Sequence, residues 1–160
     1  MKSQITWLLA GLVLTLGHDT TQKMRAECDS TSKYVVPNFK SNWYKAMEYC
    51  HYLGMKLVTV ANGDEQMAIV GSIEDTDKAN GTSFWTGGND LGDSGNYHWY
   101  STGTRIMWFN WNTSDRYGRN GDCVYLATRR EDPEADSDFN EWKWFTASCS
   151  NAKYFVCERV

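Results

Sequence analysis

The stretch CSNAKYFVCE, residues 149–158, decides the fold of this 160-residue chain more than any other. It places Cys149 and Cys157 around a Lys-Tyr-Phe-Val run, and such aromatic and β-branched runs are typical of short β-strands. Three more cysteines precede it, at Cys28, Cys50 and Cys123. An odd number leaves one thiol without an internal partner, and spacing alone does not fix how the other four pair.

The N-terminal segment 1–17 is predicted to be a secretory signal peptide. Lys2 provides the positive start, an apolar run follows from Ile5 to Leu16, and Gly17 suits cleavage. The run is too short to cross a membrane as a helix. Residues 18–32 are polar and irregular and are interpreted as an N-terminal tail. Secretion makes disulfide bonds expected.

The remaining residues, 33–160, have the length of one domain. The formal net charge of the whole chain is −4, and its charges are scattered. Nucleic-acid binding requires a basic face, so a nucleic-acid partner is not expected. No later segment is apolar enough for a membrane span.

Two helices are expected first, followed by strands, which is an α+β order. The first helix is capped by Ser41 or Asn42, buries Trp43, Ala46, Met47 and Cys50, and stops at Gly54. The second helix spans 62–75 and places Met67, Val70 and Ile73 on one stripe. Short apolar runs predict strands over 33–36, 56–60, 84–88, 97–101, 106–109, 123–127, 141–145 and 153–158.

Six segments in this order resemble the C-type lectin-like domain, from about Lys33 to Arg159. They are AMEYCHYLGMKLVTV (46–60), FWTGGND (84–90), GNYHWYSTG (95–103), WFNWN (108–112), GDCVYL (121–126) and CSNAKYFVCE. The resemblance implies two helices, two small antiparallel sheets, a long loop region and two disulfides, Cys50–Cys157 and Cys123–Cys149. Cys28 is then unpaired, and two outcomes stay open for it: a disulfide to a second chain or to a partner, which would give a covalent dimer, and a thiol capped by a small molecule.

Sugar-binding members of that family hold calcium with a Glu-Pro-Asn or Gln-Pro-Asp tripeptide, a Glu before the third cysteine and a Trp-Asn-Asp run before the fourth. Here the tripeptide aligns with Asp115-Arg116-Tyr117 or with 113–115, Gly121 replaces the Glu, and Trp144-Phe145-Thr146 replaces the run. Only Asp115 remains as a ligand, and calcium needs six to eight oxygens. The principal calcium site is therefore expected to be lost; no other cofactor is expected, and calcium stays open only with an incomplete set of ligands.

Weaker cation ligands are Asp90 and Asp122, which resemble two of four carboxylates in the family's auxiliary calcium site. The acidic stretch 131–142 alternates carboxylates but lacks the turn glycine and final Glu of an EF-hand, which favours a solvated loop.

Several aromatic side chains could bind a sugar ring without metal. Trp43, Trp85, Trp99, Trp111 and Trp144 are expected in the core, whereas Trp108, Trp142 and Tyr117 could be exposed beside Asp115 and Arg116. Sequons predict N-glycosylation at Asn80 and Asn112.

The function expected is recognition outside the cell, not catalysis. The three histidines are separated, and no nucleophile elbow or phosphate-binding glycine loop occurs. Two binding functions stay open: a secreted lectin for glycans or glycoproteins, and a calcium-independent module for a protein ligand. Fold alone does not choose between them.

Overall fold

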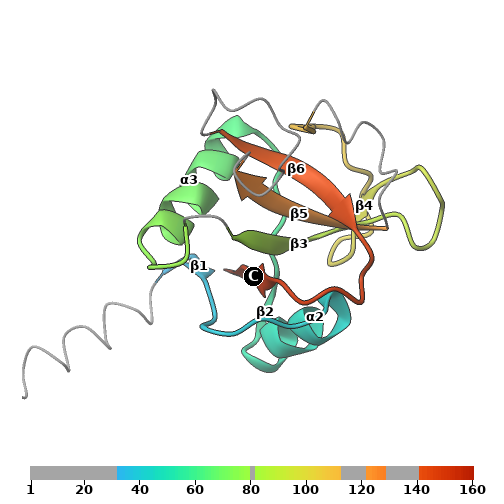
Figure 1. Cartoon of the computed structure of the whole chain (residues 1–160). Coiled ribbons are helices and arrows are strands. Elements are labelled where there is room, and N and C mark those ends of the chain that lie inside the picture. The colour runs from blue at the N-terminus through green and yellow to red at the C-terminus, as the bar shows by residue number, and fades with distance from the viewer. Residues whose placement is uncertain (1–31, 80–81, 113–121, 129–140) are drawn as a thin grey trace, which may run out of the picture. The chain divides into compact units, whose positions relative to one another are not determined.

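The computed structural model describes residues 32–79, 82–112, 122–128 and 141–160 (Figure 1). The predicted signal peptide, nearly all of the predicted tail, Cys28, Asn80 and Asp115–Tyr117 lie outside these residues. Within them, the helices are α2 (Trp43–Tyr52) and α3 (Gly63–Glu74). The strands are β1 (Tyr34–Val35), β2 (Met55–Leu57), β3 (Ser83–Asn89), β4 (His98–Trp99), β5 (Cys123–Thr128), β6 (Trp142–Ala147), β7 (Tyr154–Phe155) and β8 (Cys157–Arg159).

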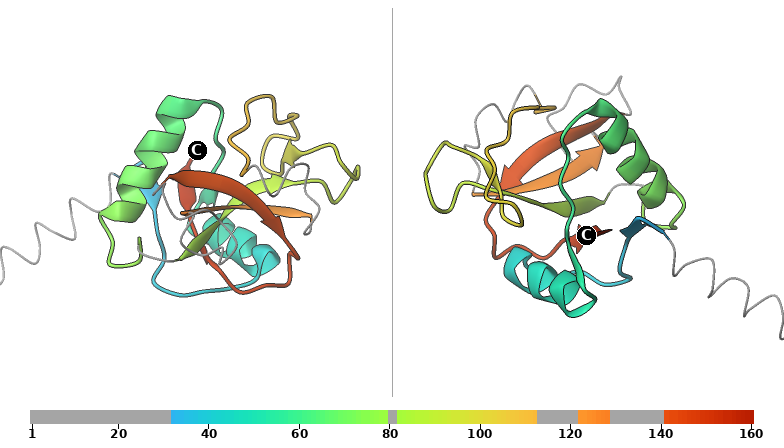
Figure 2. Two further views of the ribbon diagram at one scale, coloured as in Figure 1. Left: turned by 45° about the horizontal axis from the view of Figure 1, so that its top comes forward. Right: turned by 180° about the vertical axis from the view of Figure 1, so that it is seen from behind.

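The strands form two sheets, which confirms the predicted α+β fold with two helices (Figure 2). The smaller sheet has the order β1-β8-β2 and is antiparallel. The larger sheet has the order β4-β3-β5-β6, with β7 pairing parallel to β3. Helix α2 lies below the larger sheet in the view of Figure 1, and α3 lies to its side.

Helix α2 begins and ends where the sequence predicts. The Asn42 side chain accepts a hydrogen bond from the Lys45 N–H at 2.9 Å, which is an N-cap. The helix buries Trp43, Ala46 and Cys50. Gly54 follows with φ +68°, a conformation that costs glycine little because it has no Cβ.

Helix α3 buries part of the predicted stripe, but not Met67. Met67 was expected in the core but is 68% exposed, and Gln66, Ile69 and Ile73 are buried instead. Gln66 can be buried because its amide is satisfied: it donates to the Trp142 carbonyl at 3.1 Å and accepts from Trp144 Nε1 at 2.8 Å. Ile73 of the predicted stripe is buried and Val70 is half-buried, so a polar residue, Gln66, takes the buried place expected for Met67.

Some predicted strands are shorter or absent. The run 106–109 forms no strand, and the predicted strands over 56–60 and 97–101 shrink to β2 and β4. Among the described residues, segment 106–109 has no partner strand: β4 pairs with the end of β3, and the return contacts beside β4 include the Arg105–His98 bridge and the Ile106 N–H bond to the Tyr97 carbonyl at 2.8 Å. A short apolar run favours an extended backbone, but a β-strand forms only where an adjacent strand provides the backbone hydrogen bonds.

Both predicted disulfides are confirmed. Cys50–Cys157 joins α2 to β8, and Cys123–Cys149 joins β5 to the segment after β6. Four of the tryptophans expected in the core are buried: Trp43, Trp85, Trp99 and Trp144.

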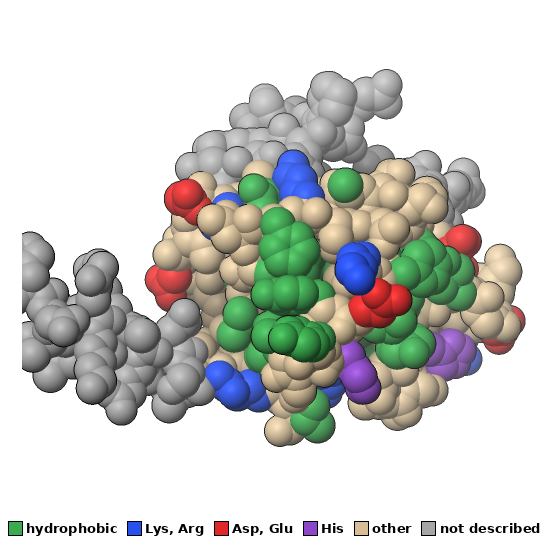
Figure 3. All heavy atoms as spheres, turned by 90° about the horizontal axis from the view of Figure 1, so that it is seen from below, with side chains coloured by type: hydrophobic (Ala, Val, Ile, Leu, Met, Phe, Trp, Pro, Cys, Tyr) green, Lys and Arg blue, Asp and Glu red, His purple; other side chains and the backbone are tan. Residues whose placement is uncertain are grey.

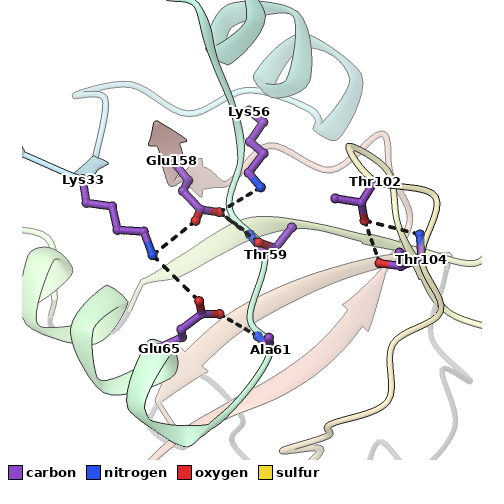
Figure 4. A network of polar contacts seen from close by, with 8 residues as sticks. All are labelled: Lys33, Lys56, Thr59, Ala61, Glu65, Thr102, Thr104 and Glu158. Atoms are coloured by element: carbon purple, nitrogen blue, oxygen red, sulfur yellow. Dashed lines mark hydrogen bonds and ion pairs between the residues drawn. The ribbon is translucent and has the colours of Figure 1, made fainter. Parts of the chain in front are cut away.

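A buried carboxylate, Glu158, ties the smaller sheet to the chain after β2 (Figure 4). It accepts hydrogen bonds from the Thr59 N–H and hydroxyl at 3.1 and 2.9 Å. Lys33 and Lys56 pair with it at 3.4 and 3.6 Å. The pKa of Lys33 is raised, mainly by its side-chain hydrogen bond to Tyr34 and then by nearby negative charge. The cluster thus satisfies a charge that would be costly to bury alone.

Candidate binding surface

Phe145 and Thr146 of β6, which the resemblance aligns with calcium-ligand positions of the family, are both buried. Strand β6 pairs with β5 in the register Tyr125↔Phe145 and Val124↔Thr146. Phe145 is 6% exposed and Thr146 is 2% exposed. Phe145 also stacks on Tyr125, with ring centroids 5.4 Å apart. Neither side chain offers an oxygen at the surface, since one is a hydrocarbon and the other is buried.

Asp90 and Asp122 are brought together, but through the backbone. The Asp90 N–H donates to the Asp122 carbonyl at 3.0 Å. The Asp90 side chain is buried; its Oδ2 accepts from the Gly95 N–H at 2.7 Å, while Oδ1 has no hydrogen-bond partner. Asp122 is exposed. In the described part of the chain, no three His, Cys, Asp or Glu side chains lie together as a metal site would require.

Trp142, which the sequence suggested as an exposed ligand contact, is buried at 8% exposure. It packs against Phe84 with ring centroids 5.8 Å apart, and its Nε1 donates to Glu74 Oε1 at 3.3 Å. The prediction was wrong because α3 and β3 cover the end of β6, a contact between segments far apart in sequence. Trp142 therefore contributes to the core and not to a binding surface.

Trp108 is half-buried and leans on the core, with its ring 5.5 Å from that of Trp144. The exposed side chains in this segment are its neighbours, Met107 at 79% and Phe109 at 50%. Phe109 stacks on Trp111, with ring centroids 6.2 Å apart and planes at 23°. Met107, Trp108, Phe109 and Trp111 are called the aromatic ridge below.

The aromatic ridge is held firmly to β6. The Trp144 N–H donates to the Asn110 carbonyl at 2.8 Å, and the Asn112 N–H donates to the Trp144 carbonyl at 2.9 Å. The Asn110 side chain also donates to the Trp142 carbonyl and accepts from Lys143 Nζ, at 3.0 and 3.1 Å. These bonds fix the orientation of Phe109 before any ligand arrives.

Sequence reasoning missed Met107 and Phe109, although a signal was present. In the extended run 106–109, alternate side chains point to opposite sides. Ile106 is buried, so Met107 and Phe109 face outward while Trp108 faces inward.

Asn112, one of the two predicted N-glycosylation sites, is only 3% exposed. Its glycosylation stays a prediction.

Residues 39–159 match the family model described as the lectin C-type domain. The chain belongs to the C-type lectin family. A Culex quinquefasciatus protein named C-type lectin mosGCTL-7 is 42% identical over 164 aligned positions, covering 97% of this chain and 91% of that protein. The protein named Salivary C-type lectin 1 of Aedes albopictus is 31% identical to this lectin. The alignment covers 84% of this chain and 86% of that protein.

Solved structures agree with the fold of the lectin. The crystal structure of human lithostathine superimposes with a TM-score of 0.64 at 25% identity, covering 79% of this chain and 81% of that one. C-type lectins are a carbohydrate-binding family, so a glycan ligand is the general expectation. In the lectin's described residues, no helix is long and apolar enough to cross a membrane.

Proposed function

We propose that this lectin is a secreted recognition protein that binds glycans or glycoproteins without the family's principal calcium site. The observation that carries this is the burial of Phe145 and Thr146 where the family places an amide and a carboxylate. Calcium takes six to eight oxygens, and β6 supplies none at its surface. Asp115 would remain as a lone ligand, and Asp90 with Asp122 would give a weak auxiliary cation site at most.

The aromatic ridge is the metal-free alternative to a calcium-centred sugar site. Sugar rings have apolar C–H faces, which pack well on an aromatic ring that is fixed in place. Phe109 offers such a ring, half-exposed and supported from behind by Trp111. Arg116 and Tyr117 follow the ridge in sequence and would add polar contacts to sugar hydroxyls.

A protein ligand is the second candidate. Met107 is 79% exposed and Leu91 is 46% exposed. Methionine and aromatic side chains are enriched at protein interfaces, where a few of them carry most of the binding energy. A hydrophobic ridge fits this function as well as it fits a sugar.

Secretion, glycosylation and dimerisation complete the proposal. The apolar segment 5–16 supports export, and the two disulfides fit an oxidising compartment. Related mosquito proteins carry the word salivary in their names, which also fits export. Asn80 would carry the glycan, and Cys28 would link two copies or bind a partner thiol.

A glycan array tests the proposal, with the secreted lectin applied once in millimolar calcium and once in chelator. Equal binding to the same glycans in both arms is the expected result. Binding only in calcium would overturn the metal-free site. Binding to no glycan in either arm would favour the protein ligand, which pull-down with wild type beside Phe109→Ala would then identify.

A further inference from the structure

A pocket of about 590 Å³ lies between α2, β2 and the turn after β4, outside the aromatic ridge. Its walls include Met47 and His51 of α2, Met55 and Leu57 of β2, and Tyr100 and Ser101 of the turn. Figure 3 views the molecule from below, the side on which α2 lies in Figure 1, and hydrophobic side chains gather there. Three of the pocket's residues carry soft or borderline metal-ligand atoms: two thioethers and one imidazole.

The three donors have a regular spacing, Met47-x₃-His51-x₃-Met55. Met47 and His51 are four residues apart on α2, which puts their Cβ atoms about 5–6 Å apart on one helix face. Gly54, with φ +68°, then turns the chain, and its N–H donates to the His51 carbonyl at 2.9 Å. The turn brings Met55 into β2, against the helix that it follows, so all three residues line the same pocket.

The donors are also available. The His51 side chain is exposed and makes no hydrogen bond among the described contacts. His98, in contrast, uses its Nδ1 for a 2.8 Å hydrogen bond to the Asn96 carbonyl. Met47 is half-buried and Met55 is 4% exposed. The two thioethers would therefore form the part of the site shielded from water, and His51 would form the part that faces solvent.

The chemistry of the lining selects the ligand. The pocket's walls contain no carboxylate or thiolate side chain, and the single C-terminal carboxylate of Val160 is too few oxygens for a calcium or magnesium cage. Lys56 lines the pocket, but its ammonium pairs with Glu158 at 3.6 Å. Thioether and imidazole donors are neutral, and soft sulfur donors select monovalent copper over hard cations.

We propose that Met47, His51 and Met55 form a binding site for a soft monovalent metal ion, Cu(I) or its redox-inert analogue Ag(I). This site is independent of the glycan or protein surface on the aromatic ridge. Its failure would leave the proposed function untouched, and failure of that function would leave this site untouched.

The test is a titration of the full-length secreted lectin with silver nitrate in chloride-free buffer, followed by the ¹³C-methyl resonances of its methionines. All proteins carry Cys28→Ser, because a free thiol would compete for silver. Met67 and Met107 are internal controls, since they are 68% and 79% exposed and lie outside the pocket walls. The expected result is a saturable shift at one equivalent that moves Met47 and Met55 and leaves Met67 and Met107 in place.

Variants then separate a built site from chance binding to thioethers. Met47→Leu keeps the volume and removes the sulfur, and His51→Gln removes the imidazole. Each should lower the silver affinity at least tenfold, whereas Met67→Leu and Met107→Leu should leave it unchanged. Equal shifts at Met47, Met55, Met67 and Met107, no shift at Met47 and Met55, or full affinity in Met47→Leu would each overturn the proposal.

Discussion

Phe145 stacks on Tyr125 across the β5–β6 pair, with ring centroids 5.4 Å apart and ring planes at 19°. A phenylalanine ring has no oxygen to offer calcium, and this one packs within the sheet. The resemblance aligns this position with an amide ligand of calcium-binding lectins, and the predictions below test what that substitution implies.

The first prediction is that millimolar calcium leaves the melting temperature unchanged. A ligand at a hundredfold excess over its Kd would stabilise the fold by about 2.7 kcal/mol. Differential scanning calorimetry with calcium and with chelator measures this. A rise of several degrees that Asp115→Ala abolishes would show that the principal site is intact.

The second prediction concerns Phe109. Phe109→Ala should weaken binding of the ligand found on the array by about 0.5–1.5 kcal/mol, the usual value of an aromatic contact. Its effect on the melting temperature should be small, because Phe109 is half-exposed. Tyr52→Ala is the matched control, an 84% exposed aromatic residue on α2. If Tyr52→Ala weakens binding more than Phe109→Ala, the ridge is not the binding surface.

The third prediction ranks the two disulfides. Cys50 and Cys157 are separated by 107 residues, and Cys123 and Cys149 by 26. On the chain-entropy model, replacing each pair by alanine should lower the free energy of unfolding by about 5 and about 3.5 kcal/mol, respectively. Urea unfolding of the two double variants checks the order. A larger loss from the shorter loop would mean that local packing, not loop closure, dominates.

The fourth prediction concerns the buried carboxylate. Glu158→Gln keeps the shape but removes the charge that Lys33, Lys56 and Thr59 satisfy. We expect a loss of about 2 kcal/mol in the free energy of unfolding, within the range for hydrogen bonds to charged groups. Glu48→Gln, which breaks an exposed pair with Lys45, should change it by less than about 0.5 kcal/mol. Equal effects of the two variants would argue against a structural role for Glu158.

The fifth prediction concerns Cys28. Because the other four cysteines are paired within the domain, secreted wild-type protein should run partly as a covalent dimer on a non-reducing gel. Cys28→Ser should run as a monomer. Such a dimer would gain avidity for a multivalent glycan without new contacts. A wild-type band at monomer mass alone would remove the dimer from the proposal.

The sequence by itself determined the local features of this lectin domain. The Asn42 cap, the Gly54 stop and the order of helices and strands follow from the preferences of neighbouring residues, which act over one or two turns of chain. The resemblance to the family added the disulfide pairing, which cysteine spacing left open.

Only the tertiary structure decided which faces are buried. Gln66 is in the core and Met67 is not because Trp144, 78 residues away, hydrogen-bonds to the Gln66 amide. Trp142 is covered by segments distant in sequence, and Phe109 is exposed because its neighbours Trp108 and Trp111 pack against Trp144. Periodicity gives the spacing of a buried stripe, but its rotation depends on partners that only folding brings into contact.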